Sequence, residues 1–379
     1  MLAWVAPVAA AALAVGGGLL ANNTASAEPP LPKKTAQQLL TAVAGAHVPG
    51  LSGTVTETAD LGLPSLPTGG QGGPMASSNF SDLISGTHTL NVWTSGTDKS
   101  RVALLGTYGE SDLIRNGNQS WLWSSKDKQA AHTTYQGKLP SDTTPAPQAQ
   151  TPQQLAEQAL KAIDPTTTVS VSRNVMVAGR SAYELVLTPK DNRSLVSAVT
   201  IAIDSKTSVP LQVAVTADGQ TKPSLSVGFT KINFSVPQAS TFTFNPPAGT
   251  KVTQKVVTAP SKHDRADAKK QADKSAAATT TVGKGWTSVV ITKADSGSLG
   301  GFGSAGRGGS VGKGGPAGRV DGGHGQGTGQ LMQSLPKVSG SWGSGRLLRG
   351  ALFSAVITDD GRIAVGAVRP ELLYSALQK

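Results

Sequence analysis

Residues 112–124, DLIRNGNQSWLWS, decide the fold, because they predict a β-hairpin. Asn116-Gly117 is the turn signal, since a type I′ turn needs positive φ at both central residues and Asn-Gly tolerates it. Pairing outward from this turn gives three cross-strand pairs: Arg115 with Asn118, Leu113 with Ser120, and Asp112 with Trp121. Side chains alternate along a strand, so the hairpin has two unlike faces.

The two tryptophans of the hairpin, Trp121 and Trp123, lie on the face that also carries Asp112. They are either amphipathic rim residues, with the indole N–H toward a carboxylate, or the floor of a binding cavity. The other face carries Leu113, Leu122 and serines, which makes these leucines the alternative ligand-facing pair.

Two runs of strands are predicted by Val, Ile and Thr at period two. The first run comprises residues 51–58, 87–94, 100–105, 110–115, 119–124 and 128–133. The second run comprises residues 167–177, 181–188, 194–204, 209–217, 224–234 and 241–244. A helix that starts at Thr35 precedes them, and a helix over 151–163 separates them, with Thr151 as N-cap. We therefore predict an α+β fold with one large, strongly curved antiparallel sheet or incomplete barrel.

A Gly/Pro-rich insertion between the first two strands ends in a short apolar group. Phe80, Leu83 and Ile84 have the i, i+3, i+4 spacing of one helical turn. A turn tethered by glycines suits a movable lid, and it suits an ordinary surface loop with a docked turn equally well.

The N-terminus and the charge distribution indicate a protein outside the cytoplasm, secreted or anchored in the cell envelope. Residues 1–27 join an apolar run to an Ala-x-Ala pattern, which predicts a cleaved signal peptide or a retained membrane anchor. Residues 1–250 carry 16 Lys/Arg against 15 Asp/Glu, and residues 251–379 carry 18 against 8. Because an exported chain meets anionic lipid headgroups first, we expect the basic C-terminal third or the anchor to contact a membrane surface, and no nucleic acid to bind.

The last part of the chain predicts a second, smaller unit. Its elements are a strand over 286–291, a hairpin over 353–368 and a helix that starts at Pro370. The predicted organisation is a signal peptide or anchor at 1–27, a main domain at 28–254, a basic linker at 255–284, and a small α+β domain at 285–379 interrupted by a Gly-rich insertion at 297–329.

Catalytic and metal-binding patterns are missing from the sequence. Gly301-Phe-Gly303-Ser-Ala-Gly306 matches G-x-G-x-x-G, but glycine continues on both sides and no apolar helix follows. The chain has no cysteine, and its histidines lack metal-ligand spacing. We therefore predict no enzyme activity, no catalytic residues, no metal site and no cofactor.

Four motifs occur in order within residues 110–252: NGNQSWLW (116–123), TPQQLAEQAL (151–160), YELVLTPK (183–190) and FTFNPPAGTKV (242–252). Together they resemble the LolA/LolB family of lipoprotein carriers, which is related to the mycobacterial lipid carriers. The resemblance implies a half-open antiparallel β-barrel with an apolar concave side and a helical lid, which holds acyl chains in transit. It leaves Arg101 as a candidate for the family's lid-contacting arginine.

A weaker resemblance concerns the C-terminal unit. The strand that starts at Trp286 and the later VITDDGRIAVGAV (356–368) resemble the second domain of the RseB/MucB regulators. Three functions stay open: a lipid or lipoprotein carrier, an envelope sensor that regulates a membrane anti-sigma factor, and a wall-associated β protein with a filled core. The expected partners are lipid or lipoprotein acyl chains and, for the sensor, a membrane protein.

Candidate ligand residues follow from strand alternation and share an apolar or aromatic side chain. They are Leu90, Val92, Leu113, Trp121, Leu122, Trp123, Leu185, Leu187, Ile201 and Ile203. Alternation does not say which face of a curved sheet is concave, so each is also a candidate for the structural core.

Overall fold

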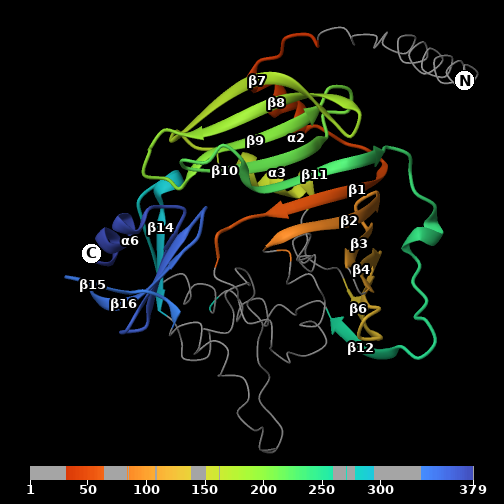
Figure 1. Cartoon of the computed structure of the whole chain (residues 1–379). Helices are drawn as coiled ribbons and strands as arrows, with labels where there is room; N and C mark the ends of the chain where they lie inside the picture. Colours follow the sequence, from red (N-terminus) through yellow and green to blue (C-terminus); the bar gives the residue numbers. More distant parts are fainter. Residues whose placement is uncertain are drawn as a thin grey trace, which may run out of the picture. The chain divides into compact units, whose positions relative to one another are not determined.

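The computed structural model describes residues 31–63, 83, 85–106, 109–137, 151–161, 163–258, 270, 278–293 and 334–378. Two β-sheets make up most of this part of the chain (Figure 1). The predicted signal peptide or anchor at 1–27, the lid candidates Phe80 and Ile84, and the Gly-rich insertion at 297–329 lie outside the described residues.

The larger sheet has 12 strands in the order β12-β6-β5-β4-β3-β2-β1-β11-β10-β9-β8-β7. Its strands are β1 (Gly50–Ala59), β2 (Gly86–Ser95), β3 (Lys99–Gly106), β4 (Gly109–Asn116), β5 (Gln119–Ser124), β6 (Gln129–Gln136), β7 (Thr167–Val177), β8 (Arg180–Pro189), β9 (Val196–Asp204), β10 (Pro210–Ala217), β11 (Pro223–Asn233) and β12 (Lys251–Thr258). Neighbours are antiparallel except β12 and β6, which run parallel. The sheet bends from β7 to β6 without closing (Figure 1), so the predicted large curved sheet is confirmed, and the described residues are mostly strands with few helices. The half-open barrel with a helical lid stays a prediction.

All predicted strands of this sheet except the last coincide with observed strands. The strand predicted over 241–244 is wrong: a 3-10 helix, η2 (Ala239–Phe242), ends there. Pro246 and Pro247 follow at once and lack the N–H groups of a ladder. The Phe242 side chain is 1% exposed, and η2 packs on β3 and β4.

The hairpin of β4 and β5 has the predicted strands but a different turn. Asn116 pairs with Gln119, so the two loop residues are Gly117 and Asn118 rather than Asn116 and Gly117. Gly117 has a φ of 59°, whereas Asn118 has no positive φ; a glycine in this first position is typical of a type II′ turn. The predicted pairing is therefore wrong by two residues. Because two residues are one full period of a strand, the predicted division into two faces holds.

Both predicted helices next to this sheet are present. α2 (Ala36–Ala44) begins with a capping box, in which the Thr35 hydroxyl accepts from the Gln38 N–H at 3.2 Å and the Gln38 side chain accepts from the Thr35 N–H at 2.8 Å. α3 (Pro152–Lys161) begins with Pro152, and the Thr151 hydroxyl accepts from the Gln154 N–H at 3.3 Å. α3 packs on β10 and β11, and α2 contacts β7.

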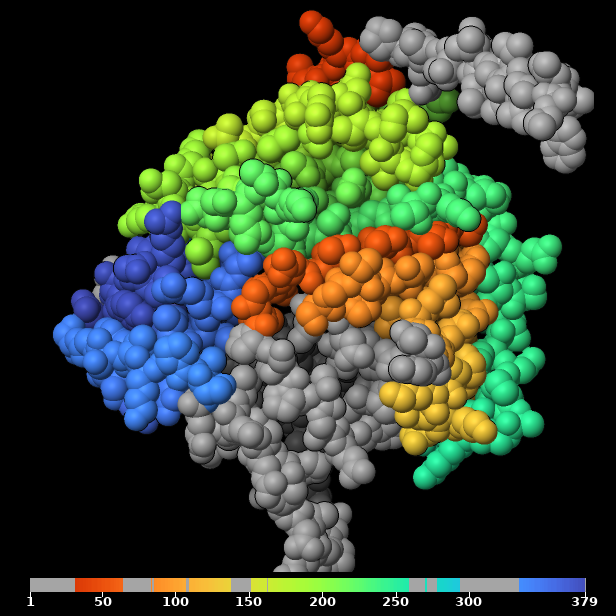
Figure 2. All heavy atoms as spheres, in the orientation of Figure 1, coloured from red at the N-terminus to blue at the C-terminus, as the bar shows by residue number. Residues whose placement is uncertain are grey.

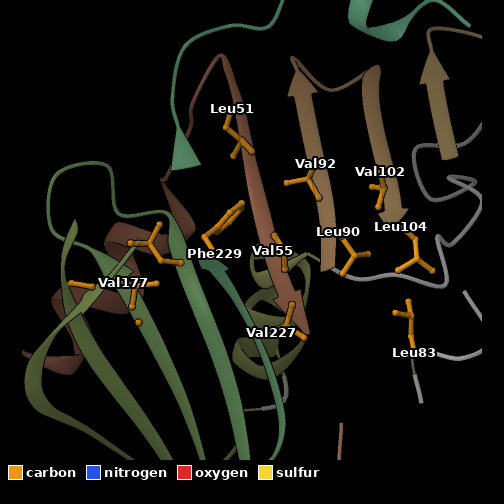
Figure 3. Packing of buried hydrophobic residues seen from close by; sticks show 13 residues of the cluster. Leu51, Val55, Leu83, Leu90, Val92, Val102, Leu104, Val177, Val227 and Phe229 are labelled. Atoms are coloured by element: carbon orange, nitrogen blue, oxygen red, sulfur yellow. The ribbon is translucent and has the colours of Figure 1, made fainter. Parts of the chain in front are cut away.

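Buried apolar side chains from both halves of the larger sheet form one cluster (Figure 3). Val55, Leu90 and Leu104 make a row across β1, β2 and β3. Phe229 on β11 pairs with Val55, and its ring lies against Gly53, where a Cβ would come within 2.8 Å of the ring. Because Gly53 has no Cβ, the Phe229 ring has room to lie against β1 at this position.

The smaller sheet has six strands in the order β13-β14-β18-β17-β16-β15. Its elements are β13 (Thr279–Val282), η3 (Gly285–Thr287), β14 (Val289–Lys293), β15 (Lys337–Gly340), β16 (Gly343–Arg349), β17 (Ser354–Thr358), β18 (Arg362–Gly366) and α6 (Pro370–Leu377). The predicted hairpin and last helix are confirmed, whereas the strand predicted to start at Trp286 starts after η3. α6 packs on β14, β17 and β18 around a core that includes Leu373.

Two strands lie in or extend into the range predicted as a basic linker, 255–284. β12 continues to Thr258, and β13 begins at Thr279. The β13 sequence is three threonines and a valine, all β-branched, which suits a strand in spite of the polar neighbourhood.

Candidate functional site

The registers place most of the predicted ligand residues on one face of the larger sheet. Val92, Val102, Leu113 and Leu122 form a row across β2, β3, β4 and β5. The neighbouring row contains Leu90. Leu90 and Val92 are each 2% exposed, so this end of the face is closed by the protein itself.

The same face becomes accessible toward β4 and β5. Leu113 and Leu122 pair directly and are only partly buried, although both pack against the apolar cluster. Some of their apolar surface therefore remains in contact with water, where a ligand can cover it.

Leu83 is the one lid candidate within the described residues. Its side chain is 5% exposed and belongs to the same cluster as Leu90 and Leu104. Figure 3 shows it beside Leu104. Its role as part of a lid stays a prediction.

The candidates on β8 and β9 are enclosed on all sides. Leu185 pairs with Ile201, and following the register through β10, β11 and β1 puts both on the face of Leu90. Leu185, Leu187, Ile201 and Ile203 are each 0% exposed. These four side chains form core in this structure, and a direct contact with a ligand stays a prediction for them.

The two tryptophans lie on the opposite face from Leu113 and Leu122. Trp121 stacks on His132, with ring centroids 4.0 Å apart and planes inclined by 6°. Phe244, which follows η2, contacts Trp121 and Trp123 at centroid distances of 5.2 and 5.6 Å. The segment around η2 thus covers the tryptophans, an arrangement that local sequence patterns do not reveal. Their role as ligand contacts stays a prediction.

An ion pair lies on the tryptophan face. Arg101 on β3 donates through Nη2 to Asp112 Oδ2 on β4 at 2.6 Å, and Glu110 Oε1 is 3.6 Å from the same nitrogen. The guanidinium also lies over the Trp93 ring, 5.4 Å from its centroid. Arg101 and Leu83 are therefore on opposite faces of the sheet, and the structure does not bring this arginine to the lid candidate.

Asp112 is the most perturbed of these charges. Its side chain is 1% exposed, and burial raises the pKa of this carboxyl to about 6, with Arg101 opposing the rise and Glu110 adding to it. In the part of the chain that the structure describes, four buried polar atoms lack a hydrogen-bond partner: Arg101 Nε, Asp112 Oδ1, Trp123 Nε1 and His132 Nε2. The expected hydrogen bond from the Trp123 indole to a carboxylate is not made.

A hollow of about 500 Å³ opens on this same face. Its lining combines polar side chains with apolar ones: Thr56, Thr58, Gln212, Ser226, Met176, Val177, Ala178 and Phe229. None of the predicted ligand residues lines it.

Two further properties of the described residues bear on function. No group of three or more His, Asp or Glu side chains among them is placed to hold a metal ion. No helix among them combines the length and the apolar character needed to span a membrane.

Comparison with known proteins gives structural resemblances only. No family model matches the sequence, and no curated protein matches it. A Pseudomonas aeruginosa MucA/MucB complex is similar at 14% identity and a TM-score of 0.39, over 90% of this chain and 96% of that chain. A LolA superfamily protein from Nitrosomonas europaea is similar at 12% identity and a TM-score of 0.22, over 56% and 99%. An uncharacterised conserved protein from Thermus thermophilus is similar at 11% identity and a TM-score of 0.33, over 58% and 99%.

These likenesses include both groups that the sequence motifs indicated, the LolA superfamily and MucB. They concern the course of the chain and say nothing about what this chain binds.

Proposed function

We propose that this chain is a binding protein outside the cytoplasm that holds acyl chains of a lipid or lipoprotein on the apolar face of β1 to β5. The supporting observation is the row in which buried Val92 and Val102 continue into partly exposed Leu113 and Leu122. Each methylene that leaves water for such a surface contributes about 0.8 kcal/mol, so an acyl chain needs no polar partner to bind there.

In this proposal the sheet acts as a half-open barrel, and the segment with Leu83 acts as its lid together with the neighbouring helices. Leu83 packs in the same cluster as Leu90 and Leu104 and lies beside Leu104 (Figure 3). An acyl chain that displaces Leu83 would cover the apolar side chains that Leu83 had covered. Replacing Leu83 by the acyl chain therefore exposes little apolar surface to water. The ligand enters from the accessible side, at Leu113 and Leu122.

Lipid uptake by the full chain tests this proposal. Purified protein is extracted with organic solvent for mass spectrometry, and uptake of a fluorescent fatty acid is measured in parallel. Leu122→Ala should lower uptake at a matched folded fraction. A loss of uptake with Trp121→Ala instead would place the acyl chain on the tryptophan face. Val256→Ala, on the exposed strand β12, controls for general loss of surface apolarity. Recovery of no lipid together with no uptake refutes the proposal.

The alternative is an envelope sensor that uses the same face to detect lipid and regulates a membrane protein. The observation that favours it is the second sheet with its own core, which carriage of acyl chains does not require. Purification of the full chain from native membranes distinguishes the two functions. A stable single-pass membrane partner of the anti-sigma type supports the sensor, and its absence from lipid-loaded protein supports the carrier.

A further inference from the structure

Strand β12 is an edge strand whose side chains are almost all in water. It pairs with β6 from Lys251 to Thr258 without a bulge, and only Val257 among its residues is partly buried. Its other edge pairs with no strand in the described part of the chain. Figure 1 shows β12 beside β6, and Figure 2 shows the blue-green residues of this region at the margin of the molecule.

The backbone groups at the free edge follow from one hydrogen bond. The Lys251 N–H donates to the Lys128 carbonyl at 2.8 Å, so the backbone N–H and C=O groups of Lys251 point toward β6. N–H and C=O groups alternate in direction along a strand, which turns those of Val252, Gln254 and Val256 away from β6. Within the described residues, the free edge therefore presents a row of N–H and C=O groups that pair with no strand, and no proline or glycine interrupts this row.

The side chains of β12 divide into two faces of different character. Lys251, Thr253, Lys255 and the partly buried Val257 lie on one face. The other face carries Val252 and Val256, which are 38% and 59% exposed, together with the uncharged Gln254 and Thr258. A strand added at this edge thus meets positive charge on one side and apolar surface on the other.

We propose that the free edge of β12 binds an extended polypeptide segment of a partner protein, which adds as a further strand and alternates acidic with apolar residues. Acidic side chains of such a segment face Lys251 and Lys255, and its apolar side chains cover Val252 and Val256. Main-chain hydrogen bonds supply affinity and the alternating side chains supply specificity, as in other cases of strand addition. A second copy of this chain fits less well, because pairing β12 with itself brings lysines together. This binding does not depend on the proposed acyl site.

A short labelled peptide that alternates valine with glutamate is the probe, measured against the full chain by fluorescence anisotropy. Gln254→Pro removes an outward N–H and leaves the β6 ladder intact, whereas the matched Gln254→Ala keeps that N–H. We expect Gln254→Ala to bind as the wild type does and Gln254→Pro to bind at least about fivefold more weakly, the worth of about one hydrogen bond. Exchanging both Lys251 and Lys255 for glutamate should shift preference to a valine–lysine peptide.

Hydrogen exchange locates the bound peptide. The amides of Val252, Gln254 and Val256 should gain protection when it binds, and circular dichroism should show the Gln254→Pro variant folded. Absence of binding at millimolar peptide, or equal binding by Gln254→Pro and Gln254→Ala, overturns the proposal. A concentration-dependent dimer that Gln254→Pro abolishes also overturns it, because the occupant is then a second copy.

Discussion

The unfolding free energy of this protein should fall as the pH rises through about 6, because Asp112 ionises in a buried position. Its carboxyl has a folded-state pKa of about 6 against an ordinary value of 3.8. Between these two values the folded chain holds the proton and the unfolded chain releases it. The contribution of Asp112 to stability is therefore fully present below about pH 4 and is lost as the pH rises through about 6.

The size of the effect follows from the two pKa values. A rise from 3.8 to about 6 corresponds to about 3 kcal/mol, at about 1.4 kcal/mol for each pH unit. Burial also raises the pKa of Glu57, which adds a contribution of the same sign. The aspartates with lowered pKa titrate below this range; they are Asp164, Asp191, Asp204 and Asp360.

The assay is urea unfolding at a series of pH values for the wild type and Asp112→Asn. Asparagine keeps the shape and an oxygen for Arg101 but does not titrate. The difference in unfolding free energy between the two proteins isolates the contribution of Asp112 from that of Glu57. Equal pH dependence in both proteins, or a wild type that gains stability relative to the variant as the pH rises through about 6, refutes the reasoning.

Three other substitutions test the packing of the larger sheet and its first helix. Gly53→Ala should cost about 2 kcal/mol in urea unfolding, because its Cβ would overlap the Lys231 carbonyl oxygen and lie 2.8 Å from the Phe229 ring; an unchanged urea midpoint would show that the neighbouring strands move apart to make room for the methyl group. Leu187→Ala should cost about 2–5 kcal/mol, since the side chain is 0% exposed, and a loss under about 1 kcal/mol would indicate a site that is not filled by core. Thr35→Ala should cost about 1 kcal/mol by removing the helix cap, measured as a lower melting temperature, whereas Thr35→Ser should cost little.

Much of the fold was predictable because it rests on local patterns. The strands of the larger sheet alternate apolar and polar residues, and Thr35 and Thr151-Pro152 begin their helices as caps should. The faces of the hairpin were also predictable, even though its turn was misplaced. Leu113 and Leu122 share a face in either register, since the two pairings differ by one full period.

Features that depend on distant partners were not predictable. The sequence of β12, KVTQKVVT, gives it no buried face. It forms a strand because it pairs with β6, which lies more than 100 residues earlier in the chain. The place of Phe242 and Phe244 against β3, β4 and the tryptophans likewise needs the sheet to exist first. The Arg101–Asp112 pair could be inferred only from the order of β3 and β4, which no single motif contains.

The ion pair of half-buried Arg101 with buried Asp112 lies on the opposite face of the sheet from the apolar row, and this arrangement ties the register to the proposed site. A slip of one residue between β3 and β4 would turn Asp112 toward Leu83 and the leucines, where a charge has no partner. The pair at 2.6 Å forms only in the native register, while burial makes it weak as a source of stability. We therefore infer that Arg101 and Asp112 select the register more than they stabilise the fold. Replacing both with leucine should leave the unfolding free energy nearly unchanged but give more than one set of NMR signals for the Leu113 and Leu122 methyl groups; a single set would show that the apolar face alone defines the register.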